Sequence, residues 1–418
     1  MPTTQTQNTT NTIPLDKGGV KGIWNTAGGI SPTIRFPWFS DWREEKKLGE
    51  VANIYDGTHQ TPNYVESGVK FVSVENIKNL NKTTKFITQE AFEKWFKIKP
   101  QKNDILMTRI TAGIIGDTAI VQNNEPLWYY VSLALIRNKI DISIKFLNQR
   151  INTNLFKNEL HKRIIHVAFP KKINLWDIND CWISLPSLPE QEKIASFLTT
   201  VDQKIEKIRE KKGLLEEYKK GLMQRLFHPP LKGDTGGSEK DYLRFPGFSD
   251  EWEEKKLGEI CEITTWKLDA NAMVENWEYR FYTCAKEYFK IDNYAFDTEA
   301  LLISGNGANV WYIHYYNGKF NAYQRTYVLD KFEEHIFYIK YYLEKFLKRR
   351  IWAEKNEWNT PYIVLGTLAD MKIKLPSISE QEKIANFLSA IDEKIEAVDS
   401  ELVEVENWKK GLLQGLFV

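Results

Sequence analysis

Residues able to carry out catalysis occur in this 418-residue chain, but none stands in a pattern that supports a reaction. The six histidines could bind zinc or transfer protons, yet none belongs to an HExxH motif or lies beside paired cysteines. Gly305-Asn-Gly307 does not open a helix as a dinucleotide-binding loop would, and no GxxxxGK(S/T) sequence is present to hold a nucleotide phosphate. We therefore predict a chain that recognises and organises other molecules and is non-catalytic by itself.

The elements that must position recognition residues come in two copies. The block Leu185–Phe227 returns as Leu375–Phe417 without gaps, with 23 identical positions. Upstream, the segment Arg35–Glu50 is matched by Arg244–Glu259. The two offsets are 190 and 209 residues, so the enclosed segment is 19 residues shorter in the second copy. The chain is therefore two tandem copies of one unit, alike at their edges and different in their middles.

The charge balance differs between the two middles. Residues 48–184 carry 18 Lys and Arg against 13 Asp and Glu, whereas residues 257–374 carry 15 against 16. If both middles bind a polyanion, the second must use a local basic patch, because its total charge gives no attraction. The candidate patch is Lys345, Lys348, Arg349 and Arg350. The alternative interpretation of this cluster is a solvated helix face.

The composition also indicates the compartment. The three cysteines, Cys181, Cys261 and Cys284, are scattered and odd in number, which is typical of a reducing cytoplasm and not of a disulfide framework. No apolar run approaches the roughly 20 residues of a membrane span. We expect a soluble, cytoplasmic protein with no membrane partner.

The repeated blocks predict two long helices. Apolar residues recur every three or four positions, which is the spacing of a heptad seam, and acidic residues crowd the first turn of each helix. About 38 residues rising about 1.5 Å each make a rod of roughly 57 Å. Such a rod cannot bury its apolar stripe alone, so the two helices are expected to pair with each other as an antiparallel coiled coil. Pairing between two chains is the competing arrangement.

Each middle predicts an α+β globule with a small, irregular sheet. Strand-like runs start at Val69, Asp104 and Ser132 in the first middle and at Ala300 and Thr326 in the second. A helical pattern follows near 144–164 and 335–351. The predicted domains are a disordered or loosely attached segment 1–34, a globule 35–184, a helix 185–227, a linker 228–243, a globule 244–374 and a helix 375–418.

This combination resembles the specificity subunit of type I restriction-modification enzymes. The markers are Arg244-Phe-Pro-Gly-Phe before the second globule and the paired Glu-Gln-Glu-Lys-Ile-Ala segments that begin at Glu190 and Glu380, each preceded by Leu-Pro-Ser. The resemblance covers nearly the whole chain from Arg35 onward. It implies two target recognition domains alternating with two long helices, in which each domain reads one half of a split DNA site and the helices set the gap between the halves.

The resemblance also implies partners and cofactors. The helix ends would dock two modification subunits, which carry adenine-N6 methyltransferase activity, and restriction subunits with ATP-dependent endonuclease activity would then join. S-adenosylmethionine, Mg and ATP would be used by those partners, and no cofactor is expected on this chain. Two domains related by a pseudo-twofold axis would read unlike half-sites about one helical turn, roughly 10 bp, apart on double-stranded DNA.

The residues predicted to contact DNA lie in polar, turn-forming stretches that follow strand-like runs. The stretch from Asp56 to Pro62 resembles a motif of some recognition domains of this family, and the pattern places Thr108, Arg109 and Thr111 at a loop tip. Arg and Gln suit bidentate contacts with guanine and adenine, whereas Lys more often holds phosphate. The predicted set is Tyr55, Asp56, Thr58, His59, Gln60, Thr61, Tyr64, Thr108, Arg109, Thr111, Thr264, Trp266, Lys267, Ser304, Asn306, Asn309, Tyr323, Gln324 and Arg325.

Other interpretations stay open. The chain could be a coiled-coil scaffold that joins two protein-binding domains without DNA contact, which the near-neutral second middle favours slightly. The off-seam residues Leu214, Tyr218 and Trp408 could bind the modification subunit or could widen the core of the coil. A fused enzyme would need methyltransferase motifs, and the nearest, Asn359-Thr-Pro-Tyr362, differs from the adenine-holding tetrapeptide at its second position.

Overall fold

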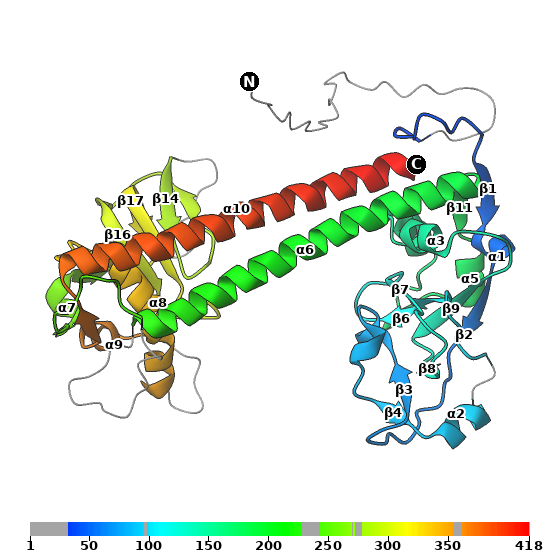
Figure 1. The fold of residues 1–418 in the computed structure, drawn as a ribbon, viewed down its shortest axis with the longest axis horizontal. Coiled ribbons are helices and arrows are strands. Elements are labelled where there is room, and N and C mark those ends of the chain that lie inside the picture. Colours follow the sequence, from blue (N-terminus) through cyan, green and yellow to red (C-terminus); the bar gives the residue numbers. More distant parts are fainter. Residues whose placement is uncertain are drawn as a thin grey trace, which may run out of the picture. The chain divides into compact units, whose positions relative to one another are not determined.

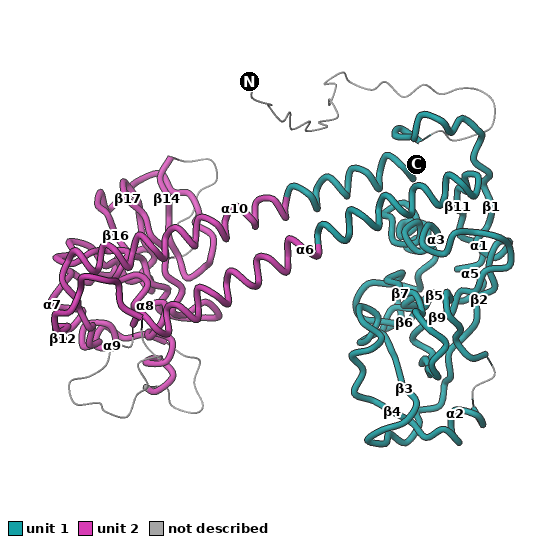
Figure 2. Tube along the Cα trace, viewed as in Figure 1, with its two compact units in different colours: residues 1–205, 404–418 teal, residues 206–403 magenta. Residues whose placement is uncertain are grey.

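The structure is a computed structural model that describes residues 32–95, 98–227, 243–269, 271, 278–354 and 362–417. The chain forms two compact units, coloured separately in Figure 2. Unit 1 consists of residues 1–205 and 404–418, and unit 2 consists of residues 206–403. The predicted N-terminal segment up to residue 31 and the predicted linker from residue 228 to 242 lie outside the described residues.

Unit 1 combines short strands with short helices. Its strands are β1 (Glu44–Lys47), β2 (Ala52–Asp56), β3 (Val69–Val72), β4 (Phe86–Ile87), β5 (Ile105–Thr108), β6 (Ile110–Thr111), β7 (Thr118–Ile120), β8 (Leu127–Tyr129), β9 (Leu133–Asn138), β10 (Lys171–Lys172) and β11 (Trp182–Leu185). Its short helices are α1 (Leu48–Val51), α2 (Gln89–Trp95), α3 (Ile144–Ile151), α4 (Asn154–His161) and α5 (Leu175–Asn179). The order β2-β9-β5-β7 forms one sheet, β4-β3-β8 a second, and β6 pairs with β10.

One apolar core joins the two sheets of unit 1. Leu106 of β5 and Leu135 of β9 are fully buried and belong to the same cluster as Phe71 of β3 and Trp128 of β8. β3 and β8 each contribute three side chains to this core, β9 contributes two and β5 contributes one. Polar loops follow β2 and β5, which end at Asp56 and Thr108.

Unit 2 is built around a larger sheet. Its strands are β12 (Glu253–Lys256), β13 (Glu262–Thr265), β14 (Tyr279–Tyr282), β15 (Phe289–Ile291), β16 (Phe296–Ser304), β17 (Ile313–Ala322), β18 (Thr326–Asp330) and β19 (Lys372–Leu375). Its shorter helices are α7 (Leu257–Ile260), α8 (Ile336–Glu354) and α9 (Leu365–Ala369). Six strands form the sheet β13-β18-β16-β17-β14-β15, in which β14 and β17 are parallel. The apolar run at the end of β16 is buried, as the Val-, Ile- and Leu-rich pattern of a central strand predicts.

The predicted secondary structure is confirmed with one difference. Strands form in all five predicted runs, as β3, β5, β9, β16 and β18, and α8 occupies the predicted helical stretch of the second middle. The helical stretch of the first middle is divided into α3 and α4. Thr153 separates them, because its hydroxyl accepts a hydrogen bond from the amide of Phe156 and so caps the start of α4.

The same pair of strands frames each middle segment. β1 pairs antiparallel with β11 in unit 1, and β12 pairs antiparallel with β19 in unit 2. An ion pair ties each frame together, Lys47 with Asp180 in unit 1 and Lys256 with Asp370 in unit 2, both at 2.8 Å. The start and the end of each middle segment therefore lie side by side.

The two repeated blocks form the long helices α6 (Leu188–Leu226) and α10 (Ile378–Leu416), which Figure 1 draws in green and in orange to red. Within unit 1, the first part of α6 lies antiparallel to the last part of α10, and Lys409 of α10 pairs with Asp202 of α6. Within unit 2, the repeat-related pair is Lys219 with Asp392, at 2.7 Å. The predicted antiparallel pairing of the two helices in one chain is therefore confirmed.

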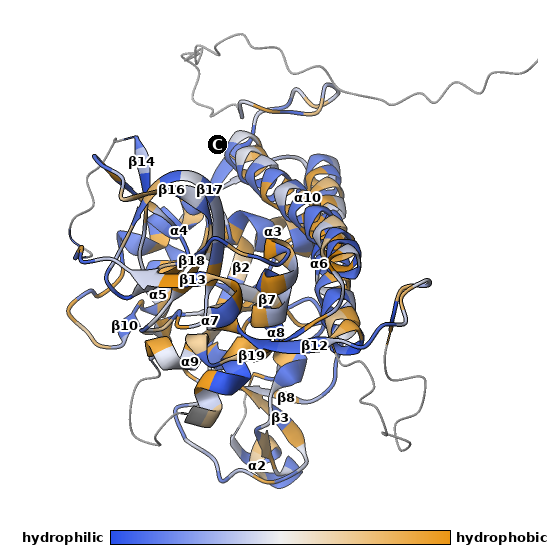
Figure 3. Ribbon diagram, turned by 90° about the vertical axis from the view of Figure 1, so that its left-hand side faces the viewer, coloured by the Kyte–Doolittle hydropathy of each residue, from blue (hydrophilic) through white to orange (hydrophobic). Residues whose placement is uncertain are grey.

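The heptad positions of both helices face inward. Hydrophobic and hydrophilic residues alternate along α6 and α10 in Figure 3. Most seam residues are buried, and Leu215, Ile395, Leu402 and Val405 are half-buried. The fully or almost fully buried seam residues are Ile194, Leu198, Val201, Ile205, Ile208, Leu222, Leu226, Ile384, Leu388, Ile391, Val398, Leu412 and Leu416.

The end of each long helix packs against a middle segment within its own unit. In unit 1 the ring of Phe417, which follows α10, lies 5.3 Å from the ring of Phe146 on α3. In unit 2 the ring of Phe227, which follows α6, lies 5.4 Å from the ring of Tyr338 on α8. Both phenylalanines are buried, so each unit is completed by the last residue of the repeated block.

Candidate nucleic-acid interface

Loops that are distant in sequence meet at one edge of the β2-β9-β5-β7 sheet of unit 1. The amide of Val131 donates to the carbonyl of Thr58 at 3.0 Å, which joins the loop after β2 to the turn before β9. The amide of Arg109 donates to the carbonyl of Ser132 at 2.9 Å. The amide of Ile173 donates to the carbonyl of Arg109 at 3.0 Å. Backbone hydrogen bonds therefore hold the loops that follow β2, β5 and β10 in one cluster.

Unit 2 repeats this hydrogen-bond framework with different residues. The amide of Gln324 donates to the carbonyl of Leu268 at 2.9 Å, the amide of Gly305 to the carbonyl of Arg325 at 2.8 Å, and the amide of Ile363 to the carbonyl of Gly305 at 2.8 Å. The three bonds join the same loops in the same order as in unit 1. The two middles thus share a loop scaffold that their sequences do not reveal. The loop cluster of each unit is hereafter called its reading cluster.

Asp56 is the centre of the reading cluster of unit 1. One of its carboxylate oxygens lies 2.6 Å from Nη1 of Arg109, and the other lies 3.0 Å from Nε2 of His59. The Asp56 carbonyl accepts a hydrogen bond from the hydroxyl of Tyr129 at 2.9 Å. Arg109 also donates to the carbonyl of Val131 at 3.1 Å, and its side chain is only 10 % exposed. The Arg109 guanidinium is therefore a buried structural group that links the loop after β2 to the turn before β9.

Two threonines of the predicted set are also structural. Thr58 is buried and its hydroxyl accepts a hydrogen bond from the indole nitrogen of Trp128. Thr108 is buried, donates to the carbonyl of Ile114 at 2.8 Å and accepts from the amide of Asp117 at 3.0 Å. The expectation that Thr108 and Arg109 lie at a loop tip is therefore wrong, because β5 continues through Thr108 and the following turn closes on its hydroxyl.

The remaining predicted residues of unit 1 differ in exposure. Thr111 is half-buried and its hydroxyl accepts the amide of Gly113 at 2.9 Å. Tyr55 is half-buried with the guanidinium of Arg137 5.9 Å from its ring centre. The exposed members of the set are His59, Gln60, Thr61 and Tyr64. The side chains that solvent or a ligand can reach are therefore those of the loop 59–64.

In unit 2 the predicted residues gather more fully at the surface. The side-chain amide of Gln324 donates to a carboxylate oxygen of Asp269 at 3.1 Å, beside the loop after β13. Trp266 is exposed on one side and packs edge-on against Phe296, with ring centres 5.5 Å apart. The exposed members of the set in this unit are Thr264, Trp266, Lys267, Gln324 and Arg325.

The loop after β16 contributes less to this surface than predicted. Asn309 donates from its side-chain amide to the carbonyl of Cys284 at 3.1 Å and is half-buried. Asn306 and Tyr323 are half-buried, and Ser304 is fully buried at the end of β16. Ser304 therefore supports the loop and does not reach the surface.

Burial affects the protonation of two cysteines, and internal contacts engage part of the candidate basic patch. Burial raises the pKa of the Cys181 and Cys261 thiols to about 12, so both stay protonated near neutral pH. Of the candidate basic patch, Arg350 donates from Nε to the carbonyl of Thr367 at 2.8 Å and Lys348 lies 5.0 Å from the ring centre of Trp311. The cluster is thus partly engaged within unit 2.

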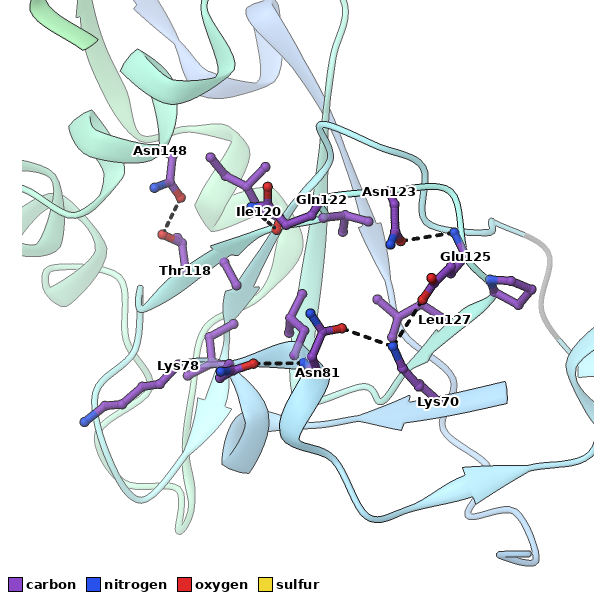
Figure 4. Close-up of a pocket in the computed structure, with 16 residues that line it drawn as sticks. Lys70, Lys78, Asn81, Thr118, Ile120, Gln122, Asn123, Glu125, Leu127 and Asn148 are labelled. Atoms are coloured by element: carbon purple, nitrogen blue, oxygen red, sulfur yellow. Dashed lines mark hydrogen bonds and ion pairs between the residues drawn. The ribbon is translucent and has the colours of Figure 1, made fainter. Parts of the chain in front are cut away.

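A cavity of about 400 Å³ in unit 1 does not coincide with the reading cluster. Figure 4 shows Lys70 held between Asn81 and Glu125, with hydrogen bonds of 3.1 Å to each. On another side Thr118 donates to Asn148 at 2.7 Å. These five polar side chains thus pair within the cavity lining, and no predicted DNA-contact residue lines the cavity.

Glu190 and Gln191, at the start of α6, position neighbouring segments, a role that the sequence analysis did not predict. The carboxylate of Glu190, fully buried, accepts from Arg35 at 2.6 Å and from Arg43 at 2.7 Å. The Gln191 side chain accepts from the amide of Ser143 at 3.1 Å and donates to the carbonyl of Pro186 at 2.9 Å, and Gln381 makes the repeat-related bonds in unit 2. The signal was available, because the repeat keeps Glu-Gln in both blocks and an arginine at Arg35 and its repeat position.

The buried charges at this junction affect each other. Burial lowers the pKa of Arg43, while the hydrogen bond to Glu190 acts in the opposite direction. Arg43 also donates to the carbonyl of Leu416 at the end of α10 at 2.5 Å. In unit 2, Trp252 stands at the repeat position of Arg43, and Glu380 pairs with Arg244 at 2.9 Å. The two units therefore share one ion pair and differ in a second.

The described residues offer neither a metal site nor a membrane span. No group of three or more His, Cys, Asp or Glu side chains in that part of the chain is placed to bind a metal ion. No helix there combines the length and the apolar character needed to cross a membrane. The reading clusters are the surfaces at which hydrogen-bonding side chains from several loops come together.

Comparison with known proteins identifies the family of this architecture. A family model described as a type I restriction modification DNA specificity domain matches residues 40–217 and 249–407. The EcoDI type I restriction enzyme specificity subunit of Escherichia coli is 36% identical over 167 residues, which is 40% of this chain and 37% of that protein. The putative MjaX specificity subunit of Methanocaldococcus jannaschii is 27% identical over 406 residues, covering 89% of this chain and 92% of that protein.

A solved structure has the same fold. The S subunit of a type I restriction-modification system from M. genitalium superimposes with a TM-score of 0.62, covering 93% of this chain and 99% of that one. The two sequences are 14% identical, so the likeness concerns the fold alone. The two matched stretches of the family model coincide with the two framed middles and their helices.

Proposed function

This chain belongs to the family of type I restriction-modification DNA specificity proteins, and from that membership we propose that it selects the DNA sequence on which a modification complex acts. Each unit would read one half of a split site on double-stranded DNA. The paired helices would set the gap between the halves. The catalytic activities, adenine-N6 methylation and ATP-dependent cleavage, would belong to partner subunits that use S-adenosylmethionine, Mg and ATP.

One observation carries the proposal: the two reading clusters have the same backbone framework and different exposed side chains. A shared framework gives both clusters the same way of approaching a duplex. Different side chains on that framework would give two unlike half-sites, because base edges are distinguished by the hydrogen-bonding groups presented to them. A scaffold that binds two proteins has no need for a common loop framework with divergent tips.

In unit 1 we assign base contact to the exposed loop residues and support to the buried ones. His59, Gln60 and Thr61 carry donors and acceptors that reach solvent, and Asp56 orients the imidazole of His59 through the bond at 3.0 Å. Arg109 would act as a positioning residue, since its guanidinium is held by Asp56 and by backbone carbonyls.

In unit 2 the candidate base contacts are Gln324 and Arg325, whose side chains are exposed beside the loop after β13. Gln suits adenine and Arg suits guanine in the major groove. Lys267 would hold phosphate, and Trp266 would pack against the sugar-phosphate backbone beside it.

The long helices offer repeat-related surfaces for two modification subunits. Tyr218 of α6, in unit 2, and Trp408 of α10, in unit 1, are 190 residues apart and occupy equivalent positions of the repeat. Tyr218 and Leu214 are exposed, whereas Trp408 is 48% exposed and the other side of its ring packs edge-on against Phe197 of α6, with ring centres 6.0 Å apart. Large, half-exposed aromatic side chains are frequent anchors of protein interfaces. We assign the docking of one modification subunit to each position.

The test is to co-express the chain with its modification subunit in a host without DNA methylation and to map N6-methyladenine by single-molecule sequencing. The expected result is a split motif with two defined halves and a fixed gap, lost when this chain is omitted. A stable complex that methylates without sequence preference contradicts the proposal and favours a scaffold.

Variants within the same experiment separate the parts of the proposal. Gln324→Ala should broaden the second half of the motif and leave the first half unchanged. Tyr218→Ala and Trp408→Ala should weaken assembly with the modification subunit, each affecting one of two bound copies. The matched surface control is Glu206→Ala, which removes an exposed side chain from α6 and should change neither motif nor assembly.

A further inference from the structure

A hairpin tip of unit 1 exposes two large apolar side chains to solvent. Val167 is 97 % exposed and Phe169 is 91 % exposed, far more than expected of side chains that contribute to a core. They lie in the turn between α4 and β10. The tip is tied at its base, because the amide of Ile165 donates to the carbonyl of Lys172 at 2.8 Å. Two almost fully exposed apolar side chains thus lie on a loop that a backbone hydrogen bond closes at its base.

The strand pair below the tip joins it to the reading cluster. β10 pairs with β6, with Lys171 opposite Thr111, so the chain enters β10 from the tip at the same end at which it leaves β6 toward Ile114. Ile114 is itself 61 % exposed. Directly after β10, Ile173 bonds to Arg109, which is held by Asp56. Strand pairing, a backbone hydrogen bond and an ion pair therefore link the apolar tip, the loop after β6 and the loop that begins at Asp56.

The hairpin and the residues just before it are also basic. Residues 161–173 contain Lys162, Arg163, Lys171 and Lys172 and no Asp or Glu. Lys171 and Lys172 are exposed, and neither makes an ion pair with any residue that the structure describes. Two free ammonium groups beside two exposed apolar side chains suit a polyanion with an apolar interior, which is the chemistry of a nucleic-acid groove.

We propose that the 165–172 hairpin enters a groove of the DNA beside the half-site of unit 1, with Phe169 and Val167 against base edges and Lys171 and Lys172 on the flanking phosphates. The proposal rests on the proposed function and adds to it an apolar contact outside the polar reading loop. Apolar side chains read thymine methyl groups in the major groove or wedge between base steps in the minor groove. A protein partner is the other possible occupant, and the absence of any carboxylate on the hairpin favours DNA.

The experiment uses the full chain assembled with its modification subunit and a duplex that contains the split site mapped for the unchanged protein. Phe169→Ala should lower affinity by about tenfold, the cost of losing one base-pair contact, and broaden only the half-site of unit 1. Lys171→Ala and Lys172→Ala should each reduce the slope of log affinity against log salt by about one. Because these side chains are exposed, the thermal midpoint of the chain should not change.

The matched control is Trp176→Ala, which removes an exposed aromatic ring from α5 of the same unit, 67 % exposed and outside the hairpin. It should leave affinity and motif unchanged. Unchanged DNA affinity in Phe169→Ala contradicts the inference alone. Weaker binding of the modification subunit with unchanged DNA affinity also overturns it and assigns the tip to a protein partner. A wild-type complex without any split motif contradicts the proposed function and this inference together.

Discussion

Arg109 of unit 1 and Gly305 of unit 2 occupy the same place in the loop framework. At this place unit 1 has a large side chain, whereas unit 2 has none. The backbone carbonyl of each residue accepts from an isoleucine amide, and its amide donates to the turn before the neighbouring strand of the sheet, β9 in unit 1 and β18 in unit 2. In unit 1 the Arg109 side chain then fills the cluster and pairs with Asp56 at 2.6 Å. In unit 2 a side chain has no room, because a Cβ on Gly305 would lie 2.6 Å from the carbonyl oxygen of Arg325.

Under the proposed function, this difference predicts that recognition and stability are coupled in unit 1 and separated in unit 2. The reading loop of unit 1 is oriented by a partly buried ion pair whose members lie behind the exposed residues. In unit 2 the backbones pack directly, and the polar side chains of Gln324 and Arg325 project from the surface. A substitution of Asp56 or Arg109 in unit 1 should therefore change both properties, whereas unit 2 should keep its stability when Gln324 or Arg325 is replaced.

The largest expected effect tests the junctions at which α6 and α10 begin. Glu190→Gln leaves Arg43, whose side chain is 1 % exposed, as a buried charge without a carboxylate, and should cost about 3–5 kcal/mol of unfolding free energy. Glu380→Gln leaves Arg244, which is partly exposed, and should cost about 1 kcal/mol. Denaturant unfolding measures both, and equal losses would contradict the asymmetry between the units.

Gly305→Ala should have the next largest effect. The added methyl group meets backbone oxygen and the ring of Tyr327, and overpacking of this kind costs about 1–3 kcal/mol. The second half of the methylated motif should weaken along with stability. Gly213→Ala is the matched control, because a Cβ there meets no atom within 4 Å and a helical alanine should stabilise by up to about 1 kcal/mol. If Gly305→Ala leaves the free energy of unfolding unchanged, the backbones at residues 305 and 325 can move apart, and the prediction is contradicted.

Asp56→Asn and Gln324→Ala compare the coupling directly. Asp56→Asn removes the charge that holds Arg109 and should lower both the thermal midpoint and the preference for the first half-site. Gln324→Ala removes an exposed side chain and should lower only the preference for the second half-site, by about 1–3 kcal/mol per base contact. Calorimetry and methylation mapping on the same preparations separate the two outcomes. A lower thermal midpoint for Gln324→Ala would contradict the predicted separation of recognition from stability in unit 2.

The smallest expected effect concerns the ion pairs between the long helices. Lys219 pairs with Asp392 and also lies 4.7 Å from the ring centre of Tyr341, whereas Lys409 pairs with Asp202 at a more exposed position. Lys219→Ala should cost about 1 kcal/mol and Lys409→Ala less, because solvent screens exposed pairs. Urea unfolding of the two variants side by side resolves the order, and the reverse order would rule out the screening argument.

The elements governed by local periodicity were predictable from the sequence. The seam of α6 and α10, the framing segments and the five strand runs each repeat a short spacing or a whole block, so the signal is contained in neighbouring residues. The helical stretch of the first middle was predicted without its division, since the cap at Thr153 depends on a single hydroxyl.

The interior of the reading clusters was not predictable in the same way. Arg109 looks like an exposed base reader in the sequence, because its partner Asp56 is 53 residues away. Glu190 looks like a first-turn helix charge until Arg35 and Arg43 are brought beside it. Burial and pairing of polar side chains depend on contacts between distant segments, which neither composition nor spacing records.

The strand frames have a consequence for how such chains diversify. Because Lys47 lies opposite Trp182 and Lys256 opposite Lys372, the two ends of each middle segment leave the frame together. A segment with adjacent ends can be exchanged for another of different length without moving its surroundings. A genetic crossover within the repeated framing sequences would thus transfer a complete loop cluster in one step, and under the proposed function it would replace one half-site while leaving the other unchanged.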